Sequence, residues 1–356
     1  MENAKKKEYK LIDVIRLVAA FLVIGLHTRP FRSISSIADN IYVYDIANYA
    51  VPFFYACTGF FLYSAQKNEL KFNIRTRIKK VVKAYILWTG IYLPLTFYGW
   101  IISGNSIIRN VLDFLRNFLF VGENYFSWTL WYLNGLIVAL ILVYALRQKY
   151  SIHMMFLISV TFYVFGYVIE LVYTYISGLP FGMQIILKFY YMIFHTTRNG
   201  IFRSFCLLAI GLEVAEIIAT NKTFNRLRIS FIAVILYVIK ILSSTFEGGG
   251  QWKVLCQLFD VPTFYVIFYY IVRWSADSRT LKTNIALFFR RLSSKIYYVH
   301  MYFVALCAIV IMGEDNYNNP LSFIIVLGLS CVLGCLMILV ENKIYESSHY
   351  RKEHKY

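Results

Sequence analysis

The chain has 356 residues, of which 59% are hydrophobic, 19% aromatic and 15% charged, with a mean hydropathy of +0.57. A soluble domain of this length cannot bury so much apolar surface, so the composition predicts a polytopic membrane protein. The net charge of +17 is spread as short basic clusters between apolar runs. This spacing is typical of topology signals and anionic-lipid contact, so we expect the lipid bilayer, and no nucleic acid, as a partner.

The first predicted element is the apolar run from Leu11 to Pro30, which carries Asp13, Arg16 and His27. Arg16 and His27 are about three helical turns apart, so both project from nearly one face, roughly 16 Å apart along the axis. Ionisable groups inside a membrane span are costly and mark functional sites. The run has no small-residue cleavage site, so we expect it to be retained as a span rather than removed as a signal peptide.

Windows of about twenty apolar residues predict an all-α fold with ten membrane-spanning helices. In chain order these cover residues 11–27, 44–65, 81–102, 128–147, 153–174, 200–218, 229–245, 254–274, 294–312 and 320–341. The connections 103–127 and 175–199 contain amphipathic stretches that are too short to span and are expected to lie at the membrane interface.

Basic residues concentrate in alternate loops, which predicts the orientation of the chain. With the N-terminus in the cytoplasm, the basic loops 66–80, 147–152, 219–228 and 273–291 are cytoplasmic and the acidic loop 313–319 is external. We therefore expect both termini in the cytoplasm, a membrane domain over 1–345, a short cytoplasmic tail over 346–356 and a location in the plasma membrane.

The six cysteines all lie in apolar runs without a CxxC spacing, which predicts packing roles and neither a disulfide framework nor a metal site. They are Cys57, Cys206, Cys256, Cys307, Cys331 and Cys335.

Several motifs follow one another along the chain. Arg16 and His27 form the pattern R-x10-H, and the second span reads VPFFYACTGFFL. The third span begins with KKVVKAY, the fourth with TLWYL, and the ninth reads SKIYYVHMYF. In this order the motifs resemble acyltransferase family 3, whose members are ten-span membrane enzymes that transfer acyl groups, usually acetyl, to carbohydrates and other acceptors. Thr58, Thr129, Lys80 and Lys83 depart from the residues that the family often has at these places.

Within that family, the VPFF form of the second span and TRNGIF at 197–202 are similar to the membrane domain of vancomycin-resistance serine racemases. Those proteins carry a pyridoxal-phosphate racemase domain after the membrane part. The sequence up to Tyr356 contains no such domain, so we expect no racemase activity from it. The subgroup is associated with serine handling, which keeps open a role as a transport module for a small polar solute such as L-serine.

The resemblance implies acyl transfer from cytoplasmic acetyl-CoA to a hydroxyl of a carbohydrate or another small polar acceptor. His27 is the expected general base, although a buried histidine can also simply form a hydrogen bond between helices. Arg16 needs an anionic partner, which is either Asp13 three residues earlier or an oxygen of the donor. We predict that Asp13 positions Arg16, and that Arg16 orients the donor or stabilises the developing oxyanion.

Lys80, Lys83 and Arg77 belong to the densest basic cluster and are predicted to bind donor phosphates, beside a topology role. His300 is predicted to lie a few residues into its span and to line the donor site. Asp260, beside Pro262, is a further intramembrane candidate. Besides the enzyme and the transport module, a membrane anchor that has lost catalysis remains a third reading of the sequence.

Overall fold

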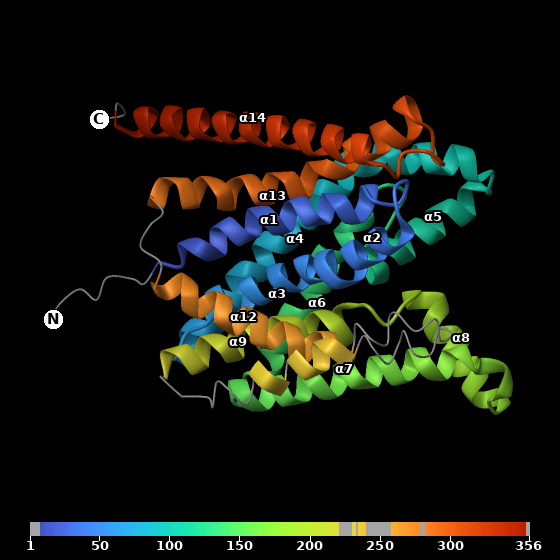
Figure 1. The fold of residues 1–356 in the computed structure, drawn as a ribbon, viewed down its shortest axis with the longest axis horizontal. Coiled ribbons are helices and arrows are strands. Elements are labelled where there is room, and N and C mark those ends of the chain that lie inside the picture. Colours follow the sequence, from blue (N-terminus) through green and yellow to red (C-terminus); the bar gives the residue numbers. More distant parts are fainter. Residues whose placement is uncertain (1–7, 221–229, 233, 240–257, 278–281, 354–356) are drawn as a thin grey trace. The chain divides into compact units, whose positions relative to one another are not determined.

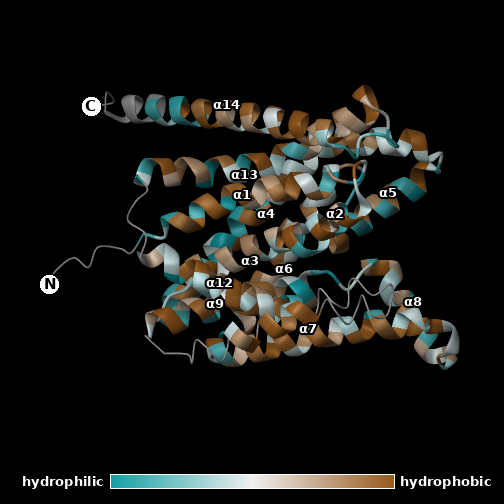
Figure 2. Ribbon diagram, in the orientation of Figure 1, coloured by the Kyte–Doolittle hydropathy of each residue, from teal (hydrophilic) through white to brown (hydrophobic). Residues whose placement is uncertain are grey.

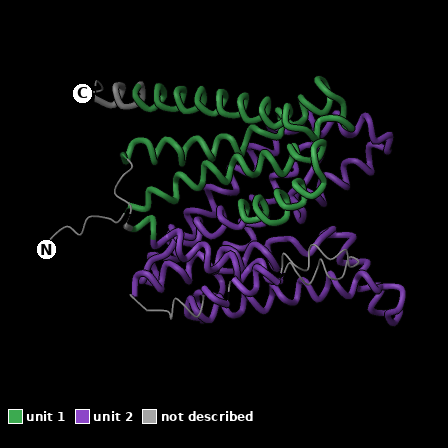
Figure 3. The backbone as a smooth tube through the Cα atoms, viewed as in Figure 1, with its two compact units in different colours: residues 1–51, 274–356 green, residues 52–273 purple. Residues whose placement is uncertain are grey.

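The computed structural model describes residues 8–220, 230–232, 234–239, 258–277 and 282–353. Within these ranges every regular element is a helix and no strand occurs, which confirms the predicted all-α class (Figure 1). The chain forms two compact units, residues 1–51 with 274–356, and residues 52–273 (Figure 3). The first is called unit 1 and the second unit 2.

Unit 1 is built on three long helices, α1 (Lys10–Thr28), α13 (Thr283–Leu306) and α14 (Pro320–Glu353). Both α1 and α14 pack along α13, although α1 and α13 come from opposite ends of the sequence (Figure 1). Short helical segments complete the unit: α2 (Ser36–Asn40), η1 (Ile41–Ile46), η2 (Ala47–Tyr49) and η7 (Cys307–Ile311). The packing of α1 on α13 therefore positions the residues of the first predicted span, which lies within α1.

The chain after α1 folds back onto that helix. Arg29 adopts a left-handed backbone with φ of 41° and its guanidinium contacts Asp39 at 2.5 Å. Gly25 gives the Tyr42 ring room to lie against α1, because a Cβ at Gly25 would be 1.8 Å from the Tyr42 hydroxyl. The Tyr42 hydroxyl donates to the carbonyl of Leu22 at 3.4 Å. A residue larger than glycine at position 25 would displace this segment.

Unit 2 contains α4 (Lys67–Ser103), α6 (Trp131–Leu146), α7 (Ile152–Thr174) and α9 (Phe205–Ala219). Here α6 packs on α4 and on α9, and α9 packs on α7. Figure 2 shows hydrophobic residues along most of α7. Helices α3 (Ala50–Leu62) and α12 (Asp260–Asp277) lie mainly in this unit, and each crosses its boundary. The shorter elements are η3 (Asn117–Val121), η4 (Trp128–Leu130), η5 (Ile176–Gly178) and η6 (Gly200–Ser204).

Two glycines allow α3 and α9 to approach at backbone distance. A Cβ at Gly59 would lie 2.1 Å from the Leu208 carbonyl oxygen, and one at Gly211 would lie 2.0 Å from that of Ala56. Small residues are the usual means of close helix packing in membranes. The glycine of the predicted second-span motif is thus needed for packing.

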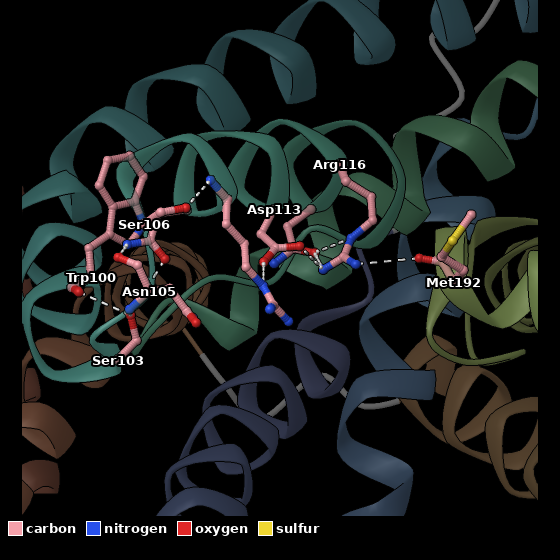
Figure 4. A network of polar contacts seen from close by, with 10 residues as sticks. Trp100, Ser103, Asn105, Ser106, Asp113, Arg116 and Met192 are labelled. Atoms are coloured by element: carbon pink, nitrogen blue, oxygen red, sulfur yellow. Dashed lines mark hydrogen bonds and ion pairs between the residues drawn. The ribbon is translucent and has the colours of Figure 1, made fainter.

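Both amphipathic stretches form short helices, as expected, namely α5 (Ile107–Arg116) and α8 (Phe181–Phe194). Arg116 of α5 links the two helices, because its guanidinium donates to the carbonyl of Met192 of α8 at 3.4 Å (Figure 4). The same guanidinium pairs with Asp113 of α5 at 3.2 Å. Their location at the membrane interface stays a prediction.

Among the described residues, six helices are long and apolar enough to cross a membrane. They are Lys10–Thr28, Lys67–Ser103, Trp128–Leu146, Ile152–Thr174, Thr283–Ile311 and Pro320–Glu346. Ten spans and cytoplasmic termini stay predictions, and parts of 229–245 together with the start of 254–274 lie outside the described residues.

Three predicted boundaries are wrong. The loop over 66–80 is the first part of α4, because it is rich in helix formers and has no glycine or proline to end the helix. Likewise α13 begins at Thr283, inside the predicted loop 273–291. The second span is shorter than 44–65, because residues before Ala50 form π- and 3₁₀-helical segments.

Candidate functional site

The structure brings His27 and His300 together on neighbouring helices of unit 1. Their ring centroids are 5.6 Å apart and the rings are inclined by 42°. His300 is fully buried, whereas His27 is partly buried. Apolar residues of α1 and α13, including Ile24 and Val304, fill the surrounding core of unit 1. Two imidazoles therefore share one largely apolar environment.

A backbone contact selects the tautomer of His300. Its Nδ1 lies 3.0 Å from the carbonyl oxygen of Ile296, one helical turn earlier. A carbonyl can only accept, so the neutral ring carries its proton on Nδ1 and its lone pair on Nε2. Nε2 is buried and has no hydrogen-bond partner among the described residues. His300 therefore presents a buried hydrogen-bond acceptor nitrogen within unit 1.

A charged cluster lies on the same two helices, at their N-terminal ends. The buried carboxylate of Asp13 has Arg16 Nη1 at 3.6 Å and Arg290 Nε at 3.7 Å, both measured to the same oxygen. The expected local pair between Asp13 and Arg16 is present, and the structure adds a second cation from α13. Both separations exceed hydrogen-bond length, so these are ion pairs without direct hydrogen bonds.

The predicted phosphate-binding residues Lys80, Lys83 and Arg77 lie in unit 2. They are exposed on the part of α4 that was expected to be a loop and the start of the third span. Lys80 and Lys83 are one helical turn apart on an exposed surface, as predicted. The histidines and the Asp13 cluster belong to unit 1.

His300 lies farther from the start of its helix than predicted, while its depth in the membrane stays a prediction. The sequence placed it a few residues into its span, but α13 begins at Thr283 and reaches His300 only after more than four turns. The search for apolar windows selected the aromatic and apolar run around Tyr297 and left out the earlier, more polar part of the same helix. His300 consequently lies beside His27 rather than near the start of the helix.

Sequence reasoning missed Arg290 as a site residue, because it was counted among the basic residues of a cytoplasmic loop. One signal could have found it. Nine residues separate Arg290 from His300, much as ten separate Arg16 from His27. Two arginine–histidine spacings of almost equal length therefore lie on two helices that pack together.

Unit 2 contains a second buried polar group. Arg203 of η6 interacts electrostatically with Tyr163 and Tyr167 of α7 and with Asp260 of α12. Asp260 is 6% exposed and Tyr163 is 3% exposed. No three His, Cys, Asp or Glu side chains within the described ranges are placed to hold a metal ion.

Comparisons with known proteins find one matching family model and several curated relatives. The family model described as Acyltransferase domain matches residues 9–340. An amino-acid racemase of Enterococcus faecalis is 25% identical over 94% of this chain and 46% of its own length. A serine/alanine racemase of Enterococcus gallinarum is 25% identical over 92% of this chain and 46% of its own length.

The chain thus spans less than half the length of these curated relatives. No solved structure matches it. The family match covers both compact units and every residue of the Asp13 cluster and the histidine pair. With its long apolar helices, the chain is a multi-pass membrane protein that belongs to acyltransferase family 3.

Proposed function

We propose that this acyltransferase moves an acetyl group from cytoplasmic acetyl-CoA to a hydroxyl of a cell-surface carbohydrate or another small polar acceptor. The enzyme would act in the plasma membrane, with residues 1–345 as its membrane domain, 346–356 as a cytoplasmic tail and both termini in the cytoplasm. The observation that carries the chemistry is the pair of adjacent imidazoles, His27 and His300, on apolar helices of a family member.

In this proposal His27 is the general base. It accepts the proton of the acceptor hydroxyl as that oxygen attacks the thioester carbonyl carbon. The carbon–sulfur bond then breaks, and the proton passes from His27 to the departing thiolate. Atoms and charge balance without a metal or a redox partner, since the products are an ester and free coenzyme A. A neutral imidazole suits this role because it exchanges one proton without leaving a net charge in the membrane.

In this scheme His300 holds the acceptor molecule beside His27. Its Nδ1–H is held by the Ile296 carbonyl, so Nε2 can accept a hydrogen bond from the acceptor or from a water. The proposal therefore places His300 with the reacting atoms, rather than at the phosphate end of the donor. His27 then receives the proton of the reacting hydroxyl, while His300 accepts a hydrogen bond from a neighbouring hydroxyl of the acceptor or from a water.

Positive charge at the other end of α1 suits the donor, which carries several phosphate charges. Arg16, positioned by Asp13, would orient the donor, and Lys80, Lys83 and Arg77 would attract its phosphates. The helical rise puts Arg16 and His27 roughly 16 Å apart along α1. Such a separation fits a donor that reaches from its phosphates to its thioester along the helix.

Purified protein in liposomes tests this proposal. Acetyl-CoA labelled on the acetyl group is supplied with soluble sugars and hydroxyl-bearing amino acids as acceptors. The wild type is expected to form a labelled ester that mild alkali releases, and His27→Ala is expected to form none above background. Ester formation at equal rates in both proteins would remove His27 as the base.

Transport of a small zwitterion is the second candidate, and the buried group in unit 2 favours it. Arg203 and Asp260 interact with each other, and such a pair of opposite charges can exchange partners with the carboxylate and ammonium of an amino acid. The relatives named as racemases act on amino acids by their printed names. Uptake of labelled L-serine into liposomes without any acyl donor, abolished in Asp260→Asn, would support transport.

A further inference from the structure

We infer that Arg290 is a second arginine of the donor site and that, with Arg16, it binds a phosphate group of the acyl donor. This inference rests on the proposed use of a coenzyme A thioester. It assigns a binding role to a residue of α13 that the sequence treated only as a topology signal.

The charge balance of the cluster supports this role. One carboxylate, that of Asp13, faces two guanidinium groups, so the three side chains carry a net charge of +1. Asp13 is the only acidic partner of Arg290 within the part of the chain that the structure describes. A partly buried cation without a full counter-charge favours an anionic ligand.

The geometry of Arg290 leaves its donors accessible. It approaches Asp13 through Nε at 3.7 Å, so its two terminal amino groups lie farther from that carboxylate. Its side chain is 41% exposed, compared with 16% for Arg16. A guanidinium that presents its terminal nitrogens can bind phosphate oxygens in a two-point arrangement.

The neighbouring basic residues on α13 bind a carboxylate on a different helix, which separates their position from that of Arg290. Arg291 contacts Glu341 of α14 at 3.1 Å, and Lys295 contacts the same carboxylate. Their charges hold α13 against α14. Arg290 instead turns toward α1, where the first-span arginine lies.

The similar arginine–histidine spacings on α1 and α13 align the proposed site along the two helices. Asp13 contacts Arg290 near the start of α1, and His27 lies beside His300 farther along both helices. The helices therefore run in the same direction, with two arginines at one level and two histidines at another. The rise from Arg290 to His300 is about 15 Å. A donor held by its phosphates at the arginines would extend its thioester toward the histidines.

Titration calorimetry with free coenzyme A tests the inference, using full-length protein in phosphatidylcholine nanodiscs. The variants are Arg290→Gln, Arg290→Lys and, as the matched control, Arg291→Gln. Loss of one charge-assisted contact is expected to weaken coenzyme A binding about tenfold or more in Arg290→Gln. Arg290→Lys should fall between, because it keeps the charge but loses the planar fork, and Arg291→Gln should bind as the wild type does.

The outcomes separate this inference from the proposed function. If the wild type binds coenzyme A and both Arg290 variants bind it equally well, the inference is overturned while the donor assignment stands. If the wild type does not bind coenzyme A, both are overturned. Repeating the titration in phosphatidylglycerol nanodiscs distinguishes a lipid phosphate as the occupant. If Arg290→Gln changes coenzyme A binding only in phosphatidylglycerol nanodiscs, because the variant no longer binds the competing lipid, the donor-site assignment is also overturned.

Discussion

His27 and His300 lie with their ring centroids 5.6 Å apart, on two helices from opposite ends of the chain. One histidine alone does not show whether its side chain reacts or only packs between helices. Their juxtaposition, with the Nε2 lone pair of His300 buried and unpartnered among the described residues, is better explained by a site that binds a hydrogen-bond donor.

His300→Ala should lower the turnover rate of acetyl transfer by about 10- to 100-fold, because the acceptor molecule loses a hydrogen bond that holds it beside the base. The Michaelis constant for acetyl-CoA should change little. Met301→Leu is the matched control, since it alters a buried neighbour of similar volume. Steady-state kinetics in liposomes measure both constants. A large rise in the Michaelis constant with unchanged turnover would instead return His300 to the donor site.

Asp13→Asn should destabilise unit 1, because it leaves the guanidinium groups of Arg16 and Arg290 facing each other without their carboxylate. We expect a loss of about 1–3 kcal/mol, reduced from the value for a fully buried pair by the exposure of Arg290. Adding Arg290→Gln should recover part of that loss. Thermal unfolding in detergent measures the double-mutant cycle, and strictly additive effects would show that the two residues are not coupled.

Gly25→Ala should destabilise the protein by about 1–3 kcal/mol, since the added methyl would overlap the ring of Tyr42. Gly90→Ala is the matched control in another long helix. A Cβ there meets nothing within 4 Å, so alanine should be neutral or stabilise by up to about 1 kcal/mol. Unfolding temperatures of both variants test the contrast. Equal stability of the two would mean that Tyr42 does not pack on Gly25.

Lys80→Gln combined with Lys83→Gln should raise the Michaelis constant for acetyl-CoA, because both side chains are exposed and are proposed to attract donor phosphates. The effect should shrink as ionic strength rises, since exposed charges are screened by salt. Lys149→Gln, another exposed lysine of unit 2, is the control. A Michaelis constant that stays at the wild-type value at low salt would leave these lysines with a topology role alone.

The sequence was sufficient to predict an all-helical chain and the places of several long apolar helices. Hydrophobic runs specify where apolar helices form, and Arg16 with His27 stood out as costly groups in one such run. The sequence was insufficient to predict which distant segments of the chain pack against each other. It placed His300 near a helix start, because the polar first turns of α13 do not resemble a span.

Arg290 was missed for a related reason. Its partner Asp13 is on α1, and a contact between helices from opposite ends of the chain leaves no local signature. The basic residues of 66–80 show the same difficulty, since a charged stretch rich in helix formers extends a membrane helix as readily as it forms a loop.

The initial rate of acetyl transfer by His27→Gln, relative to wild type in the same liposomes, tests the central claim most directly. Glutamine can keep a hydrogen bond but cannot accept the hydroxyl proton, so the rate should fall by at least about 100-fold while coenzyme A still binds. A rate within about twofold of the wild type would contradict the assignment of His27 as the general base.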